Sequence, residues 1–454
     1  MYDGMAGVAY FYWKLSRSEE AGEKRLEYLK IAEEKVETSM KDQSMVIDDS
    51  FFYGMSGVRS LAAVIYCDLE DFNKSNEHFE WILARLESDL ELDSTELLVG
   101  NAGLLSCLLF LLSNLSHSKF SYEFPKITEY LFKYATPIFS GEKINYQYAE
   151  MKFLGAAHGL SGILYVLMHI SEVMEDSNYR NIILKYLDKL ISQHTDGIFP
   201  SIYNPEASKR KLLTKQQGKK KKEDANDSAS YSSEGEEMEE KQTKKKKIMK
   251  KSKNSGTTTV GEKKEAIQMK AVKVHWCHGS AGIVFCLVKA YEVFADKKYL
   301  KIAKQAAEKV WEQGIVLKGL NLCHGVCGNA YSFLELYKCT KKEKYLYYAY
   351  QFCIFSADPE IRSKFIAFPD TERKEVGRPD NPLSLMEGIS GEACFYLDLL
   401  HPLTAQFPGF SWDIPNISQF PTSLDAPSPS PPLSTPPASI SLEINGEKEE
   451  VPAS

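Results

Sequence analysis

The sequence contains the pattern Gly-x-x-Gly seven times, each time before or inside an apolar segment. The seven copies lie at residues 4–7, 54–57, 100–103, 159–162, 279–282, 325–328 and 388–391. Successive first glycines are 50, 46, 59, 120, 46 and 63 residues apart, so only the interval of 120 departs from the period, and an insertion explains it. A pattern that returns in this way is typical of a chain built from stacked supersecondary units. The repeat therefore restricts the fold more than any other feature of the sequence.

Each repeat contains two kinds of helical segment. An apolar run such as residues 104–112 follows the glycine pair. The segments between the motifs are charged, and their apolar residues recur at three- to four-residue spacing, which is typical of surface helices with one buried stripe. These segments cover residues 23–40, 77–92, 126–136, 179–193, 298–313 and 343–355. We therefore predict an all-α fold in which seven outer–inner helix pairs form a closed ring, with an open solenoid as the alternative.

Two segments fall outside the repeat. Residues 209–253 hold 16 Lys and Arg against 8 Asp and Glu, in blocks too polar to form a core. The predicted organisation is a first ring part at 1–208, a disordered basic insertion at 209–264, a second ring part with the metal-site candidates at 265–413 and a disordered Pro/Ser-rich tail at 414–454. The insertion is interpreted as a solvated surface loop, with a nuclear-import or anionic-membrane patch as the alternative. The outer helix expected before the first glycine motif is absent, which indicates an incomplete first unit or a truncated product.

Bulk properties narrow the class of protein. The formal charge of −7 makes the molecule as a whole no obvious binder of polyanions, so no nucleic-acid partner is expected. The nine cysteines are scattered singly and no secretory leader is visible, which favours a reduced intracellular compartment. The longest apolar run, residues 103–115, is shorter than the roughly 20 residues that span a bilayer. We expect a soluble cytoplasmic protein.

Two short stretches carry the residues with the clearest metal chemistry. They are His-Trp-Cys-His-Gly at 275–279 and Leu-Cys-His-Gly at 322–325. Cys277 and Cys323 occupy the same repeat position, two residues before the first glycine, and equivalent positions of adjacent units are neighbours in a ring. With His324 they provide three protein ligands, the number that a catalytic zinc takes. We predict one Zn²⁺ on Cys277, Cys323 and His324, against the alternative of two buried structural cysteines with packed histidines.

Three further residues are candidates for catalysis or substrate binding. His158 precedes the fourth glycine pair and could move a proton near the metal, although a lone histidine is more often structural. Lys318 lies five residues before Cys323 and could bind a carboxylate, against the default of a solvated lysine. The same choice applies to Arg378, whose guanidinium suits a bidentate carboxylate contact.

These motifs resemble the eukaryotic branch of the lanthionine synthetase C-like family. The resemblance rests on Gly-Ala-Ala-His-Gly at 155–159, on the two Cys-His stretches, on Ser-Leu-Met-Glu-Gly at 384–388 and on Ala-Gln-Phe-Pro-Gly-Phe at 405–410. It covers about residues 1–413 without the insertion. The resemblance implies an α/α toroid with seven inner and seven outer helices, and zinc on Cys277, Cys323 and His324. It also implies that Lys318 matches a lysine that contacts glutathione.

The family further implies a reaction and its partners. Bacterial relatives add cysteine thiols to dehydroalanine or dehydrobutyrine, and eukaryotic relatives bind glutathione. The first hypothesis is therefore zinc-dependent addition of glutathione to dehydroamino-acid residues in proteins or peptides, with His158 as acid/base. The alternative is a catalytically weak, glutathione-binding adaptor on the same fold, in peripheral contact with the plasma membrane. A sugar-processing toroid ranks below both, because Glu387 has no evident second carboxylate near it in sequence.

Overall fold

The computed structural model describes residues 1–41, 49–88, 90, 92–115, 120, 124–206, 273–316, 318–366, 382–414, 439–444 and 447–452. The predicted basic insertion at 209–264 and the candidate Arg378 lie outside the described residues. No described helix combines the length and the apolar character that crossing a bilayer requires.

Seven inner helices begin directly after the first glycine of each motif, as predicted. They are α1 (Met5–Ser16), α3 (Met55–Asp68), α5 (Asn101–Asn114), α8 (Leu160–Leu167), α12 (Ser280–Phe294), α14 (Val326–Thr340) and α17 (Ile389–Leu400). Most of their residues are buried; in α5 every residue from Asn101 to Leu112 is. A helix that is apolar on all sides needs neighbours on all sides, and these helices find them in one another and in an outer layer.

Among the described residues, six long helices form the outer layer. They are α2 (Arg25–Lys41), α4 (Phe72–Glu87), α7 (Phe124–Ala135), α10 (Ser177–Ile191), α13 (Lys297–Gln313) and α15 (Glu343–Ala357). Helix α4 begins five residues before the predicted segment, because the Asp71 side chain accepts a hydrogen bond from Lys74 N and caps the helix there. Shorter elements are η1 (Glu19–Lys24), η3 (Thr136–Ile138), α9 (Ser171–Glu175), α16 (Pro359–Ile366) and the strands β1 (Phe139–Ser140) and β2 (Lys143–Ile144). Within the described ranges, α17 is followed by the segment 401–414 and by no outer helix.

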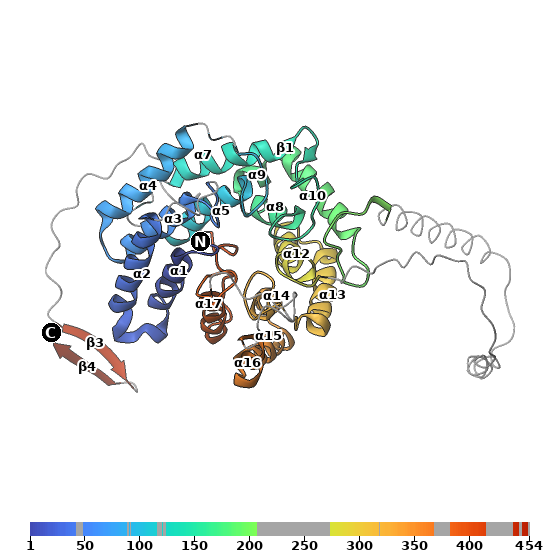
Figure 1. Ribbon diagram of the computed structural model, residues 1–454. Coiled ribbons are helices and arrows are strands. Elements are labelled where there is room, and N and C mark those ends of the chain that lie inside the picture. Colours follow the sequence, from blue (N-terminus) through green and yellow to red (C-terminus); the bar gives the residue numbers. More distant parts are fainter. Residues whose placement is uncertain are drawn as a thin grey trace, which may run out of the picture.

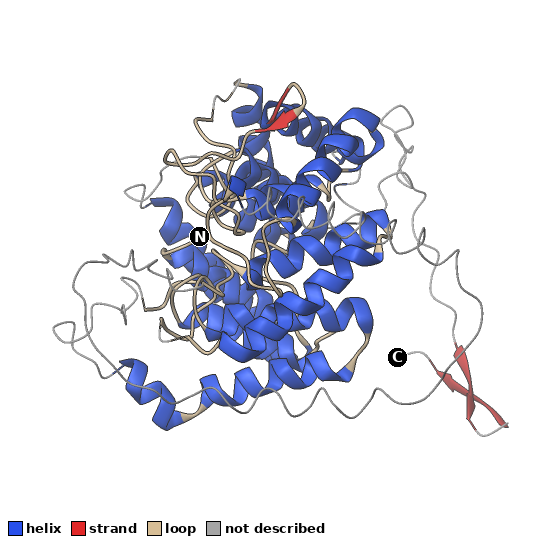
Figure 2. Cartoon of the chain, turned by 90° about the vertical axis from the view of Figure 1, so that its right-hand side faces the viewer, coloured by secondary structure: helices blue, strands red, loops and turns tan. Residues whose placement is uncertain are grey.

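The inner helices form a closed ring, so the solenoid alternative is wrong. The first and last inner helices, α1 and α17, pack against each other (Figure 1). Backbone hydrogen bonds also link the loops before the inner helices around the ring. They run from Tyr2 N to Phe52 O, Phe51 N to Gly103 O, Leu97 N to Ala157 O, Ala157 N to Cys277 O, Cys277 N to Cys323 O, Cys323 N to Met386 O and Met386 N back to Tyr2 O. All seven helix N-termini therefore meet at one mouth, where Figure 2 shows loops gathered on one side of the helical body.

The second glycine of each motif lets the loop before an inner helix pass close to the first turn of that helix. A Cβ on Gly57 would lie 1.9 Å from Phe51 O, whereas a Cβ on Gly4, the first glycine of the first motif, would have no atom within 4 Å. We expect Gly57→Ala to lower the free energy of unfolding by about 3 kcal/mol, because the backbone of the loop that precedes α3 must shift. Urea unfolding of Gly57→Ala beside the control Gly4→Ala measures this. Equal midpoints for the two variants would contradict it.

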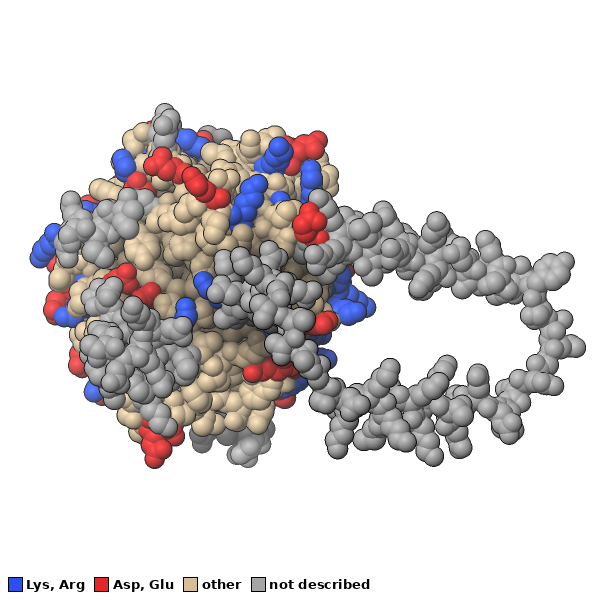
Figure 3. Space-filling model, turned by 45° about the vertical axis from the view of Figure 1, so that its right-hand side comes forward, with Lys and Arg blue, Asp and Glu red and all other residues tan. Residues whose placement is uncertain are grey.

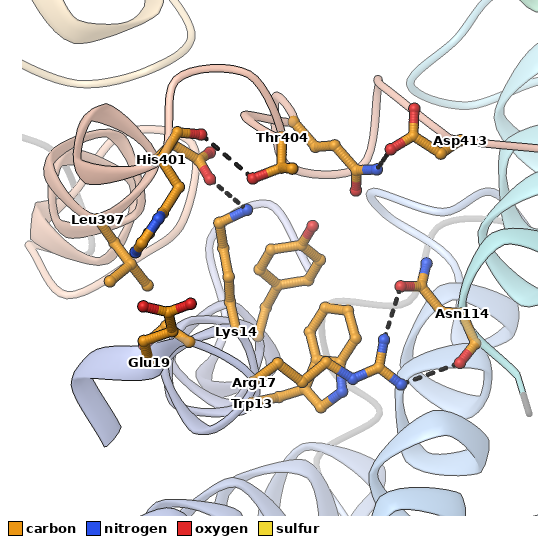
Figure 4. Close-up of a pocket in the computed structure, with 13 residues that line it drawn as sticks. Trp13, Lys14, Arg17, Glu19, Asn114, Leu397, His401, Thr404 and Asp413 are labelled. Carbon is orange, nitrogen blue, oxygen red and sulfur yellow. Dashed lines mark hydrogen bonds and ion pairs between the residues drawn. The ribbon is translucent and has the colours of Figure 1, made fainter. Parts of the chain in front are cut away.

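The C-terminal ends of the inner helices surround the opposite mouth. A cavity of ≈ 450 Å³ lies there, and Figure 4 shows residues from α1, α5 and α17 around it. Both basic residues of its lining from α1 and the residue after it form ion pairs: Lys14 Nζ lies 2.7 Å from Asp398 Oδ1, and Arg17 Nε lies 2.6 Å from Asp68 Oδ2. On the face drawn in Figure 3, the described acidic and basic side chains are interspersed.

The tail contains one element that composition did not predict. Strands β3 (Ser439–Ile444) and β4 (Glu447–Pro452) pair antiparallel, with Ile444 opposite Glu447. The local sequence carries the signal, because Ile440, Leu442 and Ile444 alternate with polar residues just before Asn-Gly, the dipeptide favoured in two-residue hairpin turns. The remaining residues of the tail from 415 onward lie outside the described ranges.

Candidate functional site

The structure brings Cys277, Cys323 and His324 together at the mouth formed by the helix N-termini. Their ligand atoms all lie within 4.8 Å of one another. The backbone hydrogen bond from Cys277 N to Cys323 O, 3.1 Å long, joins the loop before α12 to the loop before α14. Both cysteines are buried, at 6% and 4% exposure, and His324 is half-buried. Ring closure thus explains how residues 46 positions apart form one group.

These residues fit a metal ion of the zinc type. Two thiolates and an imidazole are preferred zinc ligands, and ligand atoms about 3.5 Å apart surround a tetrahedral zinc. The three ligand atoms lie within 4.8 Å of one another, and small side-chain movements would bring them to the spacing of a tetrahedral site. The surrounding packing also leaves one side of the group accessible, since His324 is only partly covered. The three residues could therefore hold a metal and leave a position for a further ligand.

The two cysteines of this group differ from each other in the direction of their pKa shifts. The hydrogen bond from the Cys323 thiol, assisted by hydrogen bonds from His275 and His324, lowers the pKa of Cys277 well below its usual value. The hydrogen bond to Cys277, together with burial, raises the pKa of Cys323. By contrast, burial alone raises the pKa of Cys286, in the second turn of α12. Of the two thiols, Cys277 therefore loses its proton first, as expected of a cysteine that binds a cation.

Tyr2 and Glu387 lie beside the metal ligands, and the sequence argument assigned neither to this site. Tyr2 OH donates a hydrogen bond to Glu387 Oε1 at 3.4 Å, and the same carboxylate oxygen lies 4.0 Å from His324 Nδ1. Burial, with the nearby Cys323 and Cys277, raises the pKa of Tyr2, so the phenol stays a neutral donor. Tyr2 stands two residues before a first glycine, as Cys277 and Cys323 do, and this shared repeat position could have identified it.

His158 forms a pair with Glu96, a residue that the sequence argument missed. His158 Nδ1 lies 3.0 Å from Glu96 Oε2, and the His158 ring stacks on Tyr148 with centroids 4.8 Å apart. The carboxylate is fixed in turn, because Glu96 accepts hydrogen bonds from Leu98 N at 3.0 Å and Val99 N at 2.7 Å. The pair therefore has one preferred geometry. In sequence, Glu96 is marked only by its place in the loop before the third glycine pair.

The His158 pair belongs to the same mouth as the metal ligands. The rings of His158 and His278 are 5.7 Å apart, and His278 follows Cys277 directly. Burial lowers the pKa of His278, so this imidazole stays neutral. The mouth thus combines a metal-type group with a histidine whose Nδ1 is held by a carboxylate.

Lys318 lies in the loop that leads to Cys323. Its side chain is exposed, and its carbonyl oxygen accepts a hydrogen bond from Asn321 Nδ2 at 3.4 Å. Asn321 Oδ1 in turn accepts from His324 N at 3.0 Å, which links this loop to the metal ligand. Within the described ranges, no carboxylate forms an ion pair with Lys318. The structure thus places Lys318, with an exposed side chain, on the loop that carries Cys323 and His324.

Comparisons with known proteins agree with this geometry. A family model described as lanthionine synthetase C-like protein matches residues 1–216 and 212–411. A relative from Danio rerio named glutathione S-transferase LANCL1 is 28% identical over 372 residues, which cover 80% of this chain and 73% of the relative. A solved structure of nisin cyclase aligns with a TM-score of 0.55 and 13% identity over 90% of each chain, a likeness that concerns the fold alone.

Proposed function

The chain belongs to the lanthionine synthetase C-like family, and from this premise we propose that it adds the thiol of glutathione to dehydroalanine or dehydrobutyrine residues in proteins or peptides. One observation carries the proposal: a group of two cysteines and a histidine shares one mouth of the ring with a carboxylate-held histidine. The name of the Danio rerio relative supports glutathione as the thiol.

Cys277, Cys323 and His324 would hold one zinc ion. When bound, the ion acts as a Lewis acid that lowers the pKa of an incoming thiol and favours its nucleophilic thiolate. The low pKa of Cys277 favours the thiolate that a metal ligand needs. Tyr2 and Glu387 supply a hydrogen-bonded pair beside the ligands, which orients polar groups at this place.

His158 would deliver the proton that completes the addition. The thiolate sulfur bonds to the β-carbon of the unsaturated residue, and the π-electron pair moves toward the α-carbon and its carbonyl. The α-carbon then needs a proton. Because Glu96 holds Nδ1 of His158, Nε2 is the ring nitrogen left to take the proton from the incoming thiol and then to give it to the α-carbon. Glu96 stabilises the charged imidazole between these two transfers.

Lys318 and Arg378 would bind the carboxylates of glutathione. The exposed Lys318 ammonium group stands on the loop that carries Cys323, which is the right side of the ring for a thiol that approaches the metal ligands. Arg378 is proposed for the same task from the sequence argument, with a bidentate contact.

The reaction can be tested with purified protein, glutathione and a peptide that contains one dehydroalanine. We expect the peptide to gain the mass of one glutathione in a reaction that needs both Cys323 and His158. Isothermal titration of glutathione in parallel separates binding from turnover. A protein that binds zinc and glutathione but leaves the peptide unchanged would overturn the enzymatic proposal and favour the adaptor alternative.

The location of this activity is a proposal too. We place it in the cytoplasm, because singly scattered cysteines suit a reducing compartment. Peripheral contact with the plasma membrane, and nuclear import as a lesser alternative, would involve the lysine blocks of the insertion. Fractionation of cells that express the chain with and without residues 209–264 distinguishes these locations.

A further inference from the structure

The segment 401–414 enters the ring from the mouth opposite the candidate metal site. Phe407 and Phe410 are fully buried in the ring, while Gln406 and Asp413 line cavities at the opposite mouth. The two cavities have volumes of ≈ 450 and ≈ 440 Å³, and Gln406 and Asp413 line both of them. The segment therefore passes between two cavities. The packing of its buried aromatic side chains provides much of its attachment to the ring.

The aromatic side chains of this segment reach Trp276, which stands between His275 and Cys277. Trp276 stacks on Phe407 with ring centroids 4.8 Å apart and planes inclined by 16°. It meets Phe410 edge-on at 5.3 Å. The indole is fully buried, and no hydrogen-bond partner reaches its Nε1 from the described part of the chain. Ring packing alone therefore fixes the orientation of the residue that precedes Cys277.

Phe407 also touches both helices that follow the ligand-bearing loops. Its ring lies 5.6 Å from Phe285 on α12 and 5.1 Å from Tyr331 on α14, centroid to centroid. The loops before α12 and α14 carry Cys277 and the pair Cys323–His324, respectively. Phe407 thus contacts Trp276, which precedes Cys277 in the chain. It also contacts α12 and α14, the helices that follow the loops with the three candidate ligands. A displacement of Phe407 would change the separation of the two loops, because packed interiors transmit strain.

A hydrogen bond and the backbone conformation hold the segment in place. Lys338 Nζ, on α14, donates to Ala405 O at 2.7 Å. Gly409 has φ of 71°, a left-handed conformation that glycine adopts without strain, and a Cβ there would lie 2.4 Å from the ring of Phe51. The turn between Phe407 and Phe410 is therefore specific to this sequence, and it brings both rings to Trp276.

We propose that Phe407 is a positioning residue for the metal site, which acts through Trp276 to set the place of Cys277 relative to Cys323 and His324. The inference rests on the proposed function only in taking these three residues as metal ligands. It assigns a task to the C-terminal segment of the ring that is separate from filling the core. Groups that orient metal ligands without touching the metal control affinity strongly.

The test uses Phe407→Leu, which keeps an apolar side chain but removes the stacked ring. We expect the zinc dissociation constant, measured by competition with a chromophoric chelator, to rise about ten-fold. In the cobalt(II)-substituted protein, the thiolate charge-transfer and d–d bands should shift, because they report ligand geometry directly. Phe410→Leu should act in the same direction, and it provides the measurement if Phe407→Leu does not fold.

Phe333→Leu is the matched control. Phe333 is fully buried on α14, and among the described residues its ring packs on Tyr348 and Phe352 of the outer layer and not on Trp276. The control should lose comparable stability in urea and keep the zinc affinity and cobalt spectrum of the parent. The inference is overturned if Phe407→Leu and Phe410→Leu both keep the zinc affinity and the cobalt spectrum of the parent. It is also overturned if Phe333→Leu changes these two properties equally. If the Cys277→Ala variant instead keeps the metal content of the parent protein, the assignment of the ligands is overturned.

Discussion

Replacement of Cys277 or Cys323 by alanine is expected to abolish zinc binding. The parent protein should hold about one zinc per chain, because three ligands and one open position define a single site. Each variant keeps only two of the three ligand side chains, which does not suffice for tight binding. Elemental analysis of dialysed protein measures the metal content, and glutathione addition should fall to the uncatalysed rate in the same samples.

Cys286→Ala provides the control for both variants. Cys286 is fully buried on α12, and burial raises its pKa, so it behaves as a packed thiol rather than a ligand. This variant should keep one zinc even if it loses some stability. Zinc binding should also weaken as the pH falls, since protons compete with the metal for the thiolates and the imidazole. Unchanged zinc in both Cys277→Ala and Cys323→Ala would refute the site.

Replacement of His158 by glutamine is expected to slow glutathione addition by about 10²- to 10⁴-fold while zinc and glutathione still bind. The reason is that His158 would transfer a proton and would not hold the metal. Glu96→Gln should produce a smaller loss in the same direction, because the neutral amide no longer stabilises the charged imidazole. The pH profile of the rate should change in both variants. Single-turnover rates with the dehydroalanine peptide, beside glutathione titrations, separate the two effects.

His401→Gln is the matched control for His158→Gln. His401 Nε2 lies 2.9 Å from Glu20 Oε1, so it forms a histidine–glutamate pair of similar length. That pair stands by the cavity at the opposite mouth, which Figure 4 shows with His401 and Glu19 labelled. Loss of this pair should leave the addition rate unchanged. A rate for His158→Gln equal to that of His401→Gln would remove His158 from the mechanism.

The repeat pattern predicted the helical architecture with high accuracy for a physical reason. A glycine pair and an apolar run act locally: the first glycine precedes the helix, and the second lets the loop just before the helix pass within contact distance. Gly54 and Gly57 show both tasks at the start of α3. The error at α4, which begins at Phe72, came from a single capping side chain, Asp71, that periodicity does not record.

The residues of the candidate site also divide into those that the sequence pattern predicted and those that it did not. Cys277 and Cys323 were predictable because they occupy the same position in adjacent units, which closure of the ring makes neighbours, and His324 follows Cys323 directly. Glu96 was not predictable, because it lies 62 residues from His158 and shares no repeat position with it. Tyr2 was overlooked, although it does occupy the repeat position of the cysteines.

By itself, the sequence determined that this chain is built from repeated helix pairs and which residues are candidates for its metal-type group, since both follow from patterns along the chain. Only the tertiary structure decided what surrounds that group. It closed the ring between α1 and α17, paired His158 with Glu96, and placed Phe407 of the final segment against Trp276. These contacts depend on the relative positions of distant units, which packing of the whole ring fixes and which no local pattern encodes.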